Sequence, residues 1–241
     1  MSEIKKQDKR VTMYLGEDRD SNTKVGYDLN NMMVIGTSGA GKSTLMNNII
    51  TEVIQTYSHN NVGIVLIDPK GTELSIYYEH GRIPKHVEGY AGSDQEWIEE
   101  LLCKVSSIVV NRKYHNLDGK PYIVFVDEFQ VILETMPGCA VQLKWLIDNS
   151  YKYGVYIVMS SQSDGRGTDI NLEKFPIRCA LRMHRDTAET MIRYMGCTAP
   201  IEEEQKAGIV YVRDYTKEFD IKKLHFKFRP DTYIRKVLKL Y

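Results

Sequence analysis

The sequence has few cysteines, no excess of either charge and no long apolar run, and each shortage excludes a class of protein. Thirty-two basic residues balance 32 acidic ones, so overall charge does not indicate a nucleic-acid-binding protein, and any polyanion site must be a local patch. The longest apolar runs have the length of a strand, which excludes a membrane-spanning helix. No apolar stretch follows the polar residues 1–10, so no signal peptide is indicated.

The four cysteines lie far apart and form no C-x-x-C pair, which argues against a zinc site and against a disulfide framework. Such cysteine usage favours a reducing cytoplasm, and we expect a cytoplasmic protein whose membrane anchor, if it has one, is supplied elsewhere. Each cysteine lies in or beside an apolar run and is expected to be buried: Cys103, Cys139, Cys179 and Cys197.

Short apolar runs alternate with amphipathic segments, a pattern typical of an α/β fold with a mostly parallel sheet covered by helices on both faces. No linker or repeat interrupts it, so we expect a disordered tail over 1–10 and a single domain over 11–241. Strands are predicted at 11–16 (an edge strand), 32–35, 61–68, 122–128, 154–160, 177–183 and 208–212. Helices are predicted at 42–57, 93–114, 139–152, 187–195 and 232–240. The second of these is expected to begin at Ser93, with a capping box to Glu96, and to include Trp97 in its apolar face.

One segment matches the P-loop (Walker A) pattern G-x-x-x-x-G-K-[ST] in full, between a predicted strand and a predicted helix. Its glycines let backbone N–H groups turn inward toward phosphate oxygens, and the helix N-terminus adds partial positive charge. Lys42 is predicted to bind the β- and γ-phosphates, and the Ser43 hydroxyl to bind Mg²⁺. The predicted nucleotide-binding residues are Gly36, Thr37, Ser38, Gly39, Ala40, Gly41, Lys42, Ser43 and Thr44.

A P-loop needs a partner carboxylate at the end of a neighbouring buried strand, and YIVFVDE supplies one. Asp127 is predicted to orient Mg²⁺, and Glu128 to polarise the attacking water as the catalytic base. Asp68 also ends a buried strand, and its D-P-K-G segment matches the D-x-x-G of GTPases. No N-K-x-D motif occurs and Asp68 has no acidic neighbour, so ATP is favoured over GTP.

Three further polar residues are candidates for catalysis. Gln162 ends the strand after the acidic one, at the edge where ligands bind in open α/β sheets. Arg178 and Arg182 are four apart on a predicted strand and therefore share a face. We expect one of them, with Arg178 preferred, to reach the nucleotide of a neighbouring subunit as an arginine finger.

The order of these motifs resembles the motor domain of the FtsK/SpoIIIE family, in the FtsK–HerA group of P-loop ATPases, over about residues 11–230. LIDPKGTEL at 66–74 resembles the family's D-P-K-x-x-E-L segment, VDEF at 126–129 its Walker B segment, and GVYIVMSSQ at 154–162 its strand ending in A-T-Q. Ser163-Asp164 replaces the family's usual Arg-Pro. The resemblance implies a RecA-like P-loop domain that hydrolyses Mg·ATP at the subunit interfaces of a ring, usually a hexamer.

The resemblance leaves the moved substrate open. A translocase of double-stranded DNA is the leading interpretation, an ATPase module of a type VII-like protein secretion system is the alternative, and a non-hydrolysing assembly platform is a third. Membrane-anchored or secretion partners would be other chains. The loop 163–169 and the basic tail from Lys217 to Tyr241 are the candidate DNA contacts. For the tail, the alternation of Leu224, Phe226 and Phe228 favours an edge strand protected by lysines over contact with DNA.

Overall fold

The computed structural model describes residues 11–79, 83–162, 169–183, 194–196, 208–217 and 221–240. The predictions for the 1–10 tail, the loop 163–168, most of the helix 187–195 and Cys197 fall outside these ranges. The division into a tail and one domain therefore stays a prediction.

Within the described residues, ten strands form one mixed sheet in the order β2-β1-β10-β9-β8-β3-β7-β6-β4-β5. The six strands from β8 to β5 are parallel, and the remaining four extend the sheet in antiparallel fashion from β8. This confirms the predicted α/β class. The strands are β1 Thr12–Asp18, β2 Lys24–Asp28, β3 Met32–Ile35, β4 Gly63–Ile67, β5 Val87–Ala91, β6 Tyr122–Val126, β7 Val155–Ser161, β8 Ile177–Ala180, β9 Ile209–Asp214 and β10 Lys222–His225.

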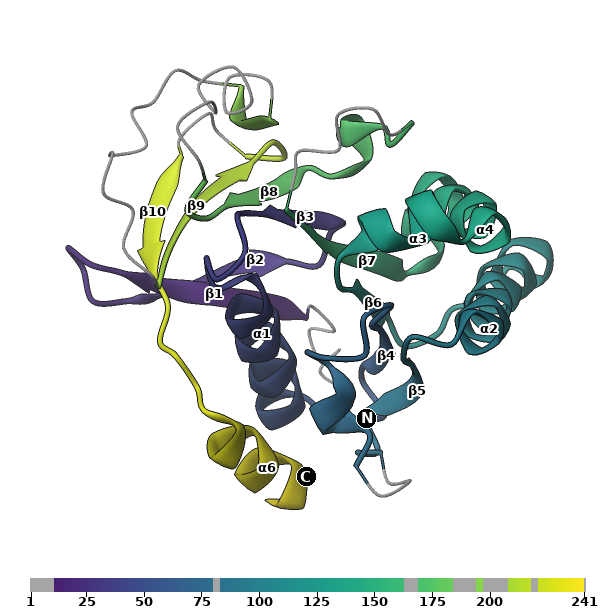
Figure 1. Cartoon of the computed structure of the whole chain (residues 1–241), viewed down its shortest axis with the longest axis horizontal. Coiled ribbons are helices and arrows are strands. Elements are labelled where there is room, and N and C mark those ends of the chain that lie inside the picture. Colours follow the sequence, from purple (N-terminus) through teal and green to yellow (C-terminus); the bar gives the residue numbers. More distant parts are fainter. Residues whose placement is uncertain are drawn as a thin grey trace, which may run out of the picture.

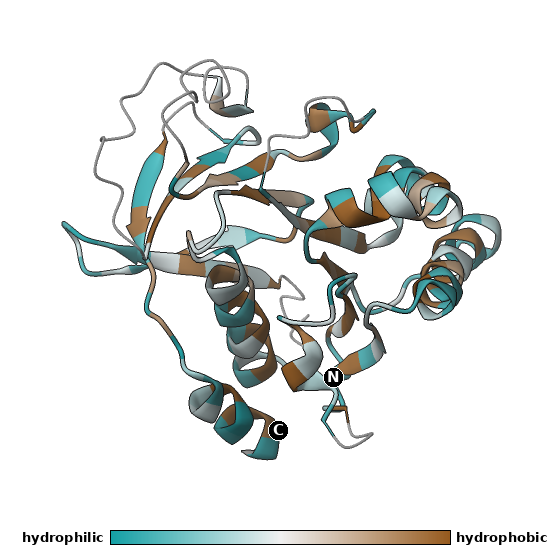
Figure 2. Ribbon diagram, in the orientation of Figure 1, coloured by the Kyte–Doolittle hydropathy of each residue, from teal (hydrophilic) through white to brown (hydrophobic). Residues whose placement is uncertain are grey.

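Helices cover both faces of the sheet (Figure 1). They are α1 Lys42–Thr56, α2 Gln95–His115, α3 Phe129–Thr135, α4 Pro137–Asn149 and α6 Asp231–Leu240, with short 3₁₀ turns at Ser75–Tyr77, Tyr151–Tyr153 and Leu172–Lys174. Alternate residues of β3 separate two apolar cores: Met32 and Val34 pack with α1, whereas Met33 and Ile35 pack with α2 and α4. Figure 2 shows the central strands mainly apolar, while each helix combines apolar and hydrophilic residues. None of the described helices has the length and apolarity to cross a membrane.

The edge-strand predictions are wrong. β10 lies inside the sheet, hydrogen-bonded to β1 on one side and β9 on the other, so its lysines do not protect an edge. β1 is likewise an inner strand, because β2, which was not predicted, pairs outside it. Non-local pairing decides strand order, and a local alternation pattern carries no information about it.

Two predictions for α2 also fail. Asp94 rather than Ser93 caps the helix, because its side chain accepts hydrogen bonds from the backbone N–H groups of Glu96 and Trp97. This places Trp97 in the first turn, where its side chain is 54% exposed instead of packing in the core. Cys103 is exposed on the same helix, whereas Cys139 and Cys179 are buried as predicted.

Candidate nucleotide-binding site

The predicted P-loop links the end of β3 to the start of α1, as the motif requires. Gly39 and Gly41 have φ values of 69° and 102°, in the left-handed region that glycine adopts without steric cost. Gly41 is the residue that caps α1, and the helix has no acidic residue in its first turn. The helix N-terminus therefore keeps an uncompensated partial positive charge where an anion would bind.

The loop is anchored to the strands on either side of β3. Gly36 N–H donates to the carbonyl of Ser161 at the end of β7, at 3.2 Å. Thr37 donates to the carbonyl of Arg182, just after β8, from its backbone N–H at 2.9 Å and from its hydroxyl at 3.1 Å. These contacts hold the loop at the carboxyl edge of the parallel strands, where ligands bind in this class of sheet.

A cavity of about 510 Å³ opens over the loop. It brings together most of the predicted site residues: Ser38, Gly39, Gly41, Lys42, Ser43, Thr44, Asp127, Glu128 and Gln162. Gly36, Thr37 and Ala40 are not among the residues that line it. Residues that the sequence did not single out as site residues also line it, namely Lys70, Thr72, Glu73, Gly208, Phe226 and Phe228.

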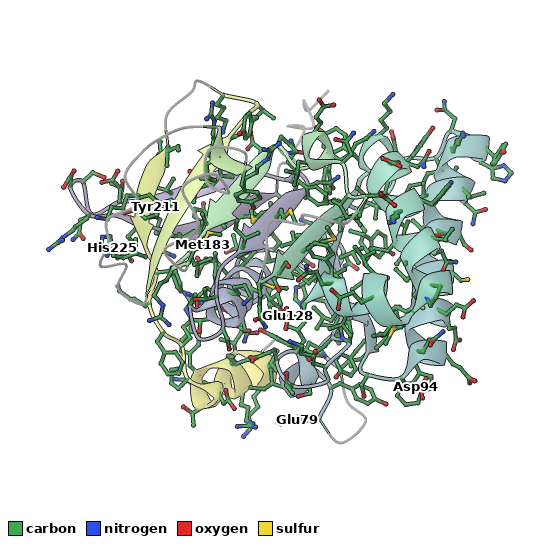
Figure 3. The ribbon with its side chains drawn as sticks, turned by 45° about the horizontal axis from the view of Figure 1, so that its top comes forward. Glu79, Asp94, Glu128, Met183, Tyr211 and His225 are labelled. Atoms are coloured by element: carbon green, nitrogen blue, oxygen red, sulfur yellow. The ribbon has the colours of Figure 1, made fainter. Side chains whose placement is uncertain are left out.

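Glu128 lies between two lysines. Its carboxylate is 3.2 Å from Lys42 Nζ and 3.7 Å from Lys70 Nζ. Lys42 is only 6% exposed and also donates to the carbonyls of Gly36, at 2.9 Å, and Thr37, at 3.3 Å. Figure 3 shows Glu128 near the middle of the molecule. The predicted base and the predicted phosphate-binding lysine therefore share one small polar site.

Asp127 ends β6 with its carboxylate buried. Burial raises its pKa to about 6, with the nearby carboxylates of Asp68, Glu128 and Glu73 adding to the shift and a hydrogen bond from Ser160 opposing it. The Ser160 hydroxyl donates to Asp127 and accepts the backbone N–H of Glu128 at 3.0 Å. Ser160, on β7, thus fixes both acidic residues, and no local motif in the sequence identifies it.

The residues of the cavity fit a magnesium ion held mainly by a nucleotide. Among the described residues, no three His, Cys, Asp or Glu side chains converge as a complete protein site for a metal. The Ser43 hydroxyl and the Asp127 carboxylate nonetheless line the same cavity. A hydroxyl, a carboxylate, phosphate oxygens and water are the oxygen ligands that Mg²⁺ uses in P-loop proteins.

Asp68 does not reach the cavity but shapes the loop that does. Its buried carboxylate accepts the backbone N–H groups of Gly71, at 2.9 Å, and of Glu73 and Leu74, each at 2.8 Å. The D-P-K-x-x-E-L segment is therefore a turn closed around an aspartate. It directs Lys70 and Glu73 into the cavity.

The three remaining candidates occupy different surroundings. Gln162 is exposed and lines the cavity. Arg178 is buried, and its guanidinium donates to the carbonyls of Leu172, Phe175 and Tyr194 at 2.8, 3.1 and 2.7 Å. Its position therefore satisfies an intrachain need that the sequence did not reveal.

Arg182 lies beyond the end of β8 and is exposed. Its Nη2 atom is 3.8 Å from the point where a side chain at Gly39 would begin. The predicted pairing of the two arginines on one face of a strand therefore does not occur, and Arg182 is the one beside a P-loop.

Comparison with known proteins agrees with this geometry. Solved structures with this fold include EssC (ATPases 2 and 3) of Geobacillus thermodenitrificans, with a TM-score of 0.74 and 15% identity over 100% of this chain and 51% of that one. The pCW3 conjugation coupling protein TcpA, solved with ATPγS, has a TM-score of 0.68 and 17% identity over 98% of this chain and 72% of that one. The fold is that of a P-loop ATPase domain.

Sequence comparison agrees with the predicted resemblance. The FtsK/SpoIIIE family model matches residues 2–117, just under half of the chain, which confirms that resemblance. The DNA translocase FtsK of Leptospira interrogans is 28% identical over 200 residues, which cover 73% of this chain and 21% of that protein. The FtsK of Shewanella oneidensis is 41% identical over 98 residues, 39% of this chain and 9% of that protein. The chain thus spans only about a fifth, or less, of these relatives.

Proposed function

We propose that this chain is the motor domain of a DNA translocase, hydrolysing Mg·ATP at the subunit interfaces of a ring, a hexamer by family resemblance, to move double-stranded DNA. The observation that carries the proposal is the convergence of Lys42, Ser43, Asp127 and Glu128 in one cavity over a P-loop. The similarity to DNA translocases named FtsK supports DNA as the substrate.

The residues divide the chemistry among them. The P-loop N–H groups, the start of α1 and Lys42 bind and orient the triphosphate. Ser43 and Asp127 hold Mg²⁺, which neutralises charge on the phosphates when it is bound. Glu128 accepts a proton from the attacking water, and Gln162, exposed at the rim, contacts the γ-phosphate.

An arginine from a neighbouring subunit completes the site in this proposal. Arg182 is the better candidate, because it is exposed whereas Arg178 is buried and bonded to three carbonyls. A guanidinium in trans stabilises the charge that develops in the transition state and makes turnover depend on assembly.

The basic tail gives DNA binding limited support. Several of its cations pair with acids of the same chain: Lys217 with Asp214, Lys227 with Glu17, Arg229 with Glu52 and Arg235 with Glu79. Such pairs reduce the positive field available to phosphates. We therefore expect DNA to be gripped mainly by other surfaces of the ring.

A protein-secretion ATPase is the second candidate function. Its support is the fold shared with EssC and with the EccC ATPases of Thermomonospora curvata, one structure of which holds a signal sequence peptide. Identity of 15–16% supports a common fold and no common substrate.

The experiment is the steady-state ATPase rate measured across protein concentration, with and without linear duplex DNA. Stimulation by DNA together with a cooperative rise with protein concentration is expected for a DNA motor built as a ring. An ATPase rate that does not change with DNA would favour the protein-secretion ATPase as the function. No hydrolysis at high protein concentration, despite ATP binding, would favour a nucleotide-gated assembly platform.

A further inference from the structure

The segment 226–230, here called the strap, joins β10 to α6 and runs along the P-loop helix α1 (Figure 1). Asn48 on α1 donates to the carbonyl of Lys227 at 2.8 Å. Arg229 donates to the Thr51 hydroxyl at 2.8 Å and to the Glu52 carboxylate at 3.1 Å. Since Thr51 and Glu52 follow Asn48 by three and four residues, the three side chains lie on one side of α1, which faces the strap.

The strap brings two aromatic rings to the cavity, and their burial differs sharply. Phe226 is 8% exposed and lies against the P-loop, where a side chain at Gly41 would begin 3.1 Å from its ζ carbon. Phe228 is 76% exposed, yet it lines the same cavity as Ser43 and Thr44. Phe226 and Phe228 therefore face the cavity, whereas Lys227 between them is not part of its lining.

The cavity is thus lined by both charged and aromatic side chains. Lys42, Lys70 and the α1 N-terminus suit a triphosphate, whereas the strap offers the largely exposed ring of Phe228. A nucleoside triphosphate likewise combines an anionic triphosphate with a planar aromatic base. Stacking on an exposed ring is a common way for a protein to hold a base, and it tolerates every base because each has a π face.

We propose that Phe228 is the base-binding platform of this site: the base of the bound nucleoside triphosphate stacks on its ring, and the bonds from Asn48 and Arg229 fix the strap that presents it. The inference rests on the proposed nucleotide-binding function and adds to it the residue that holds the base. Because stacking reads no base edge, the platform contributes affinity rather than a choice between adenine and guanine.

The test compares a ligand that has a base with one that lacks it. Dissociation constants for ATP and for inorganic tripolyphosphate are measured by calorimetry on the full chain and on the variant Phe228→Ala. We expect ATP binding to weaken by about tenfold and tripolyphosphate binding to stay unchanged. The affinity of Phe228→Ala for GTP should fall as much as its affinity for ATP. Tyr114→Ala, which removes a similarly exposed ring (75%) from α2, is the matched control and should change neither constant.

A second variant keeps an aromatic ring at position 228. Phe228→Trp should retain ATP affinity, and its indole fluorescence should respond to ATP but not to tripolyphosphate. Asn48→Ala, which removes one of the bonds that hold the strap on α1, should weaken the binding of ATP and leave the binding of tripolyphosphate unchanged.

Unchanged ATP affinity in Phe228→Ala, or an equal loss for both ligands, would overturn the inference alone. A wild-type chain that binds neither ligand would overturn the proposed function and the inference with it.

Discussion

Lys42 and Glu128 form a buried ion pair, with 3.2 Å between the lysine Nζ and the nearer carboxylate oxygen. The residue proposed to bind phosphate is therefore engaged by the residue proposed to activate water. Phosphate oxygens arriving at the P-loop compete with Glu128 for the same ammonium group. Binding of the triphosphate should thus release Glu128 toward Lys70, 3.7 Å away, and toward the attacking water.

Glu128→Gln is expected to bind ATP at least as tightly as the wild type and to lower turnover by about a hundredfold or more. The amide removes a negative charge that faces the phosphates, but it cannot accept a proton from water. Equilibrium binding and steady-state turnover measure the two effects separately. Glu73→Gln, which changes a second carboxylate that lines the same cavity, is the control and should keep most of the turnover. Wild-type turnover in Glu128→Gln would remove this residue from the mechanism.

Asp68→Ala is expected to destabilise the fold by about 2–4 kcal/mol, because the buried N–H group of Leu74 and the partly buried N–H group of Glu73 lose their acceptor. Urea denaturation measures the change. Asp94→Ala, which removes the cap of α2 at the surface, should cost only about 1 kcal/mol. Equal losses in the two variants would contradict the structural role assigned to Asp68.

The parallel half of the sheet was predictable because its strands are buried on both faces. β3, β4, β6 and β7 are short continuous apolar runs, and each is followed by a polar or glycine residue at the edge where the site lies. The P-loop and the Asp127–Glu128 pair follow from the same pattern, since a motif and its flanks are local in sequence.

The parts that could not be predicted depend on contacts between distant segments. Phe228 lines one cavity with P-loop residues more than 180 positions earlier in the chain, and the Ser160 hydroxyl donates to Asp127 from another strand. For Arg178 the sequence predicts a role at a neighbour's nucleotide, because no sequence pattern indicates that the carbonyls of Leu172 and Tyr194 turn toward its guanidinium. The sequence thus identifies the polar residues at strand ends as candidates for a site, whereas the role of each one depends on the tertiary structure.

Asp127→Asn is expected to stabilise the metal-free protein, and more at pH 8 than at pH 4. The pKa of Asp127 is about 6 in the fold against 3.8 for the ordinary side chain, so the folded state holds a proton that the unfolded state releases between these values. Above about pH 6 the buried charge costs stability on the order of 2 kcal/mol, and the cost disappears as the pH falls toward 3.8. Melting temperatures in a chelating buffer test this. A stabilisation independent of pH would contradict it.

Arg178→Ala is expected to lower stability by several kcal/mol, because the carbonyls of Leu172, Phe175 and Tyr194 each lose a hydrogen bond from a charged donor. Arg178→Lys should recover only part of the loss, since an ammonium group cannot reproduce the planar fork. Thermal melting measures both. A folded Arg178→Ala protein of wild-type stability that lacks ATPase activity would restore Arg178 as the trans arginine.

Arg182→Ala is expected to fold normally, because the side chain is exposed, and to lose turnover by about a thousandfold if the arginine acts across an interface. Mixing separates action in trans from action on the same chain. The Arg182→Ala chain keeps its P-loop, while a Lys42→Ala chain keeps Arg182 but cannot bind the triphosphate. Neither variant alone should hydrolyse ATP, whereas a mixed ring places an intact arginine beside an intact P-loop. Activity recovered on mixing is the expected result; no recovery would assign Arg182 to its own P-loop, which the 3.8 Å approach to Gly39 also allows.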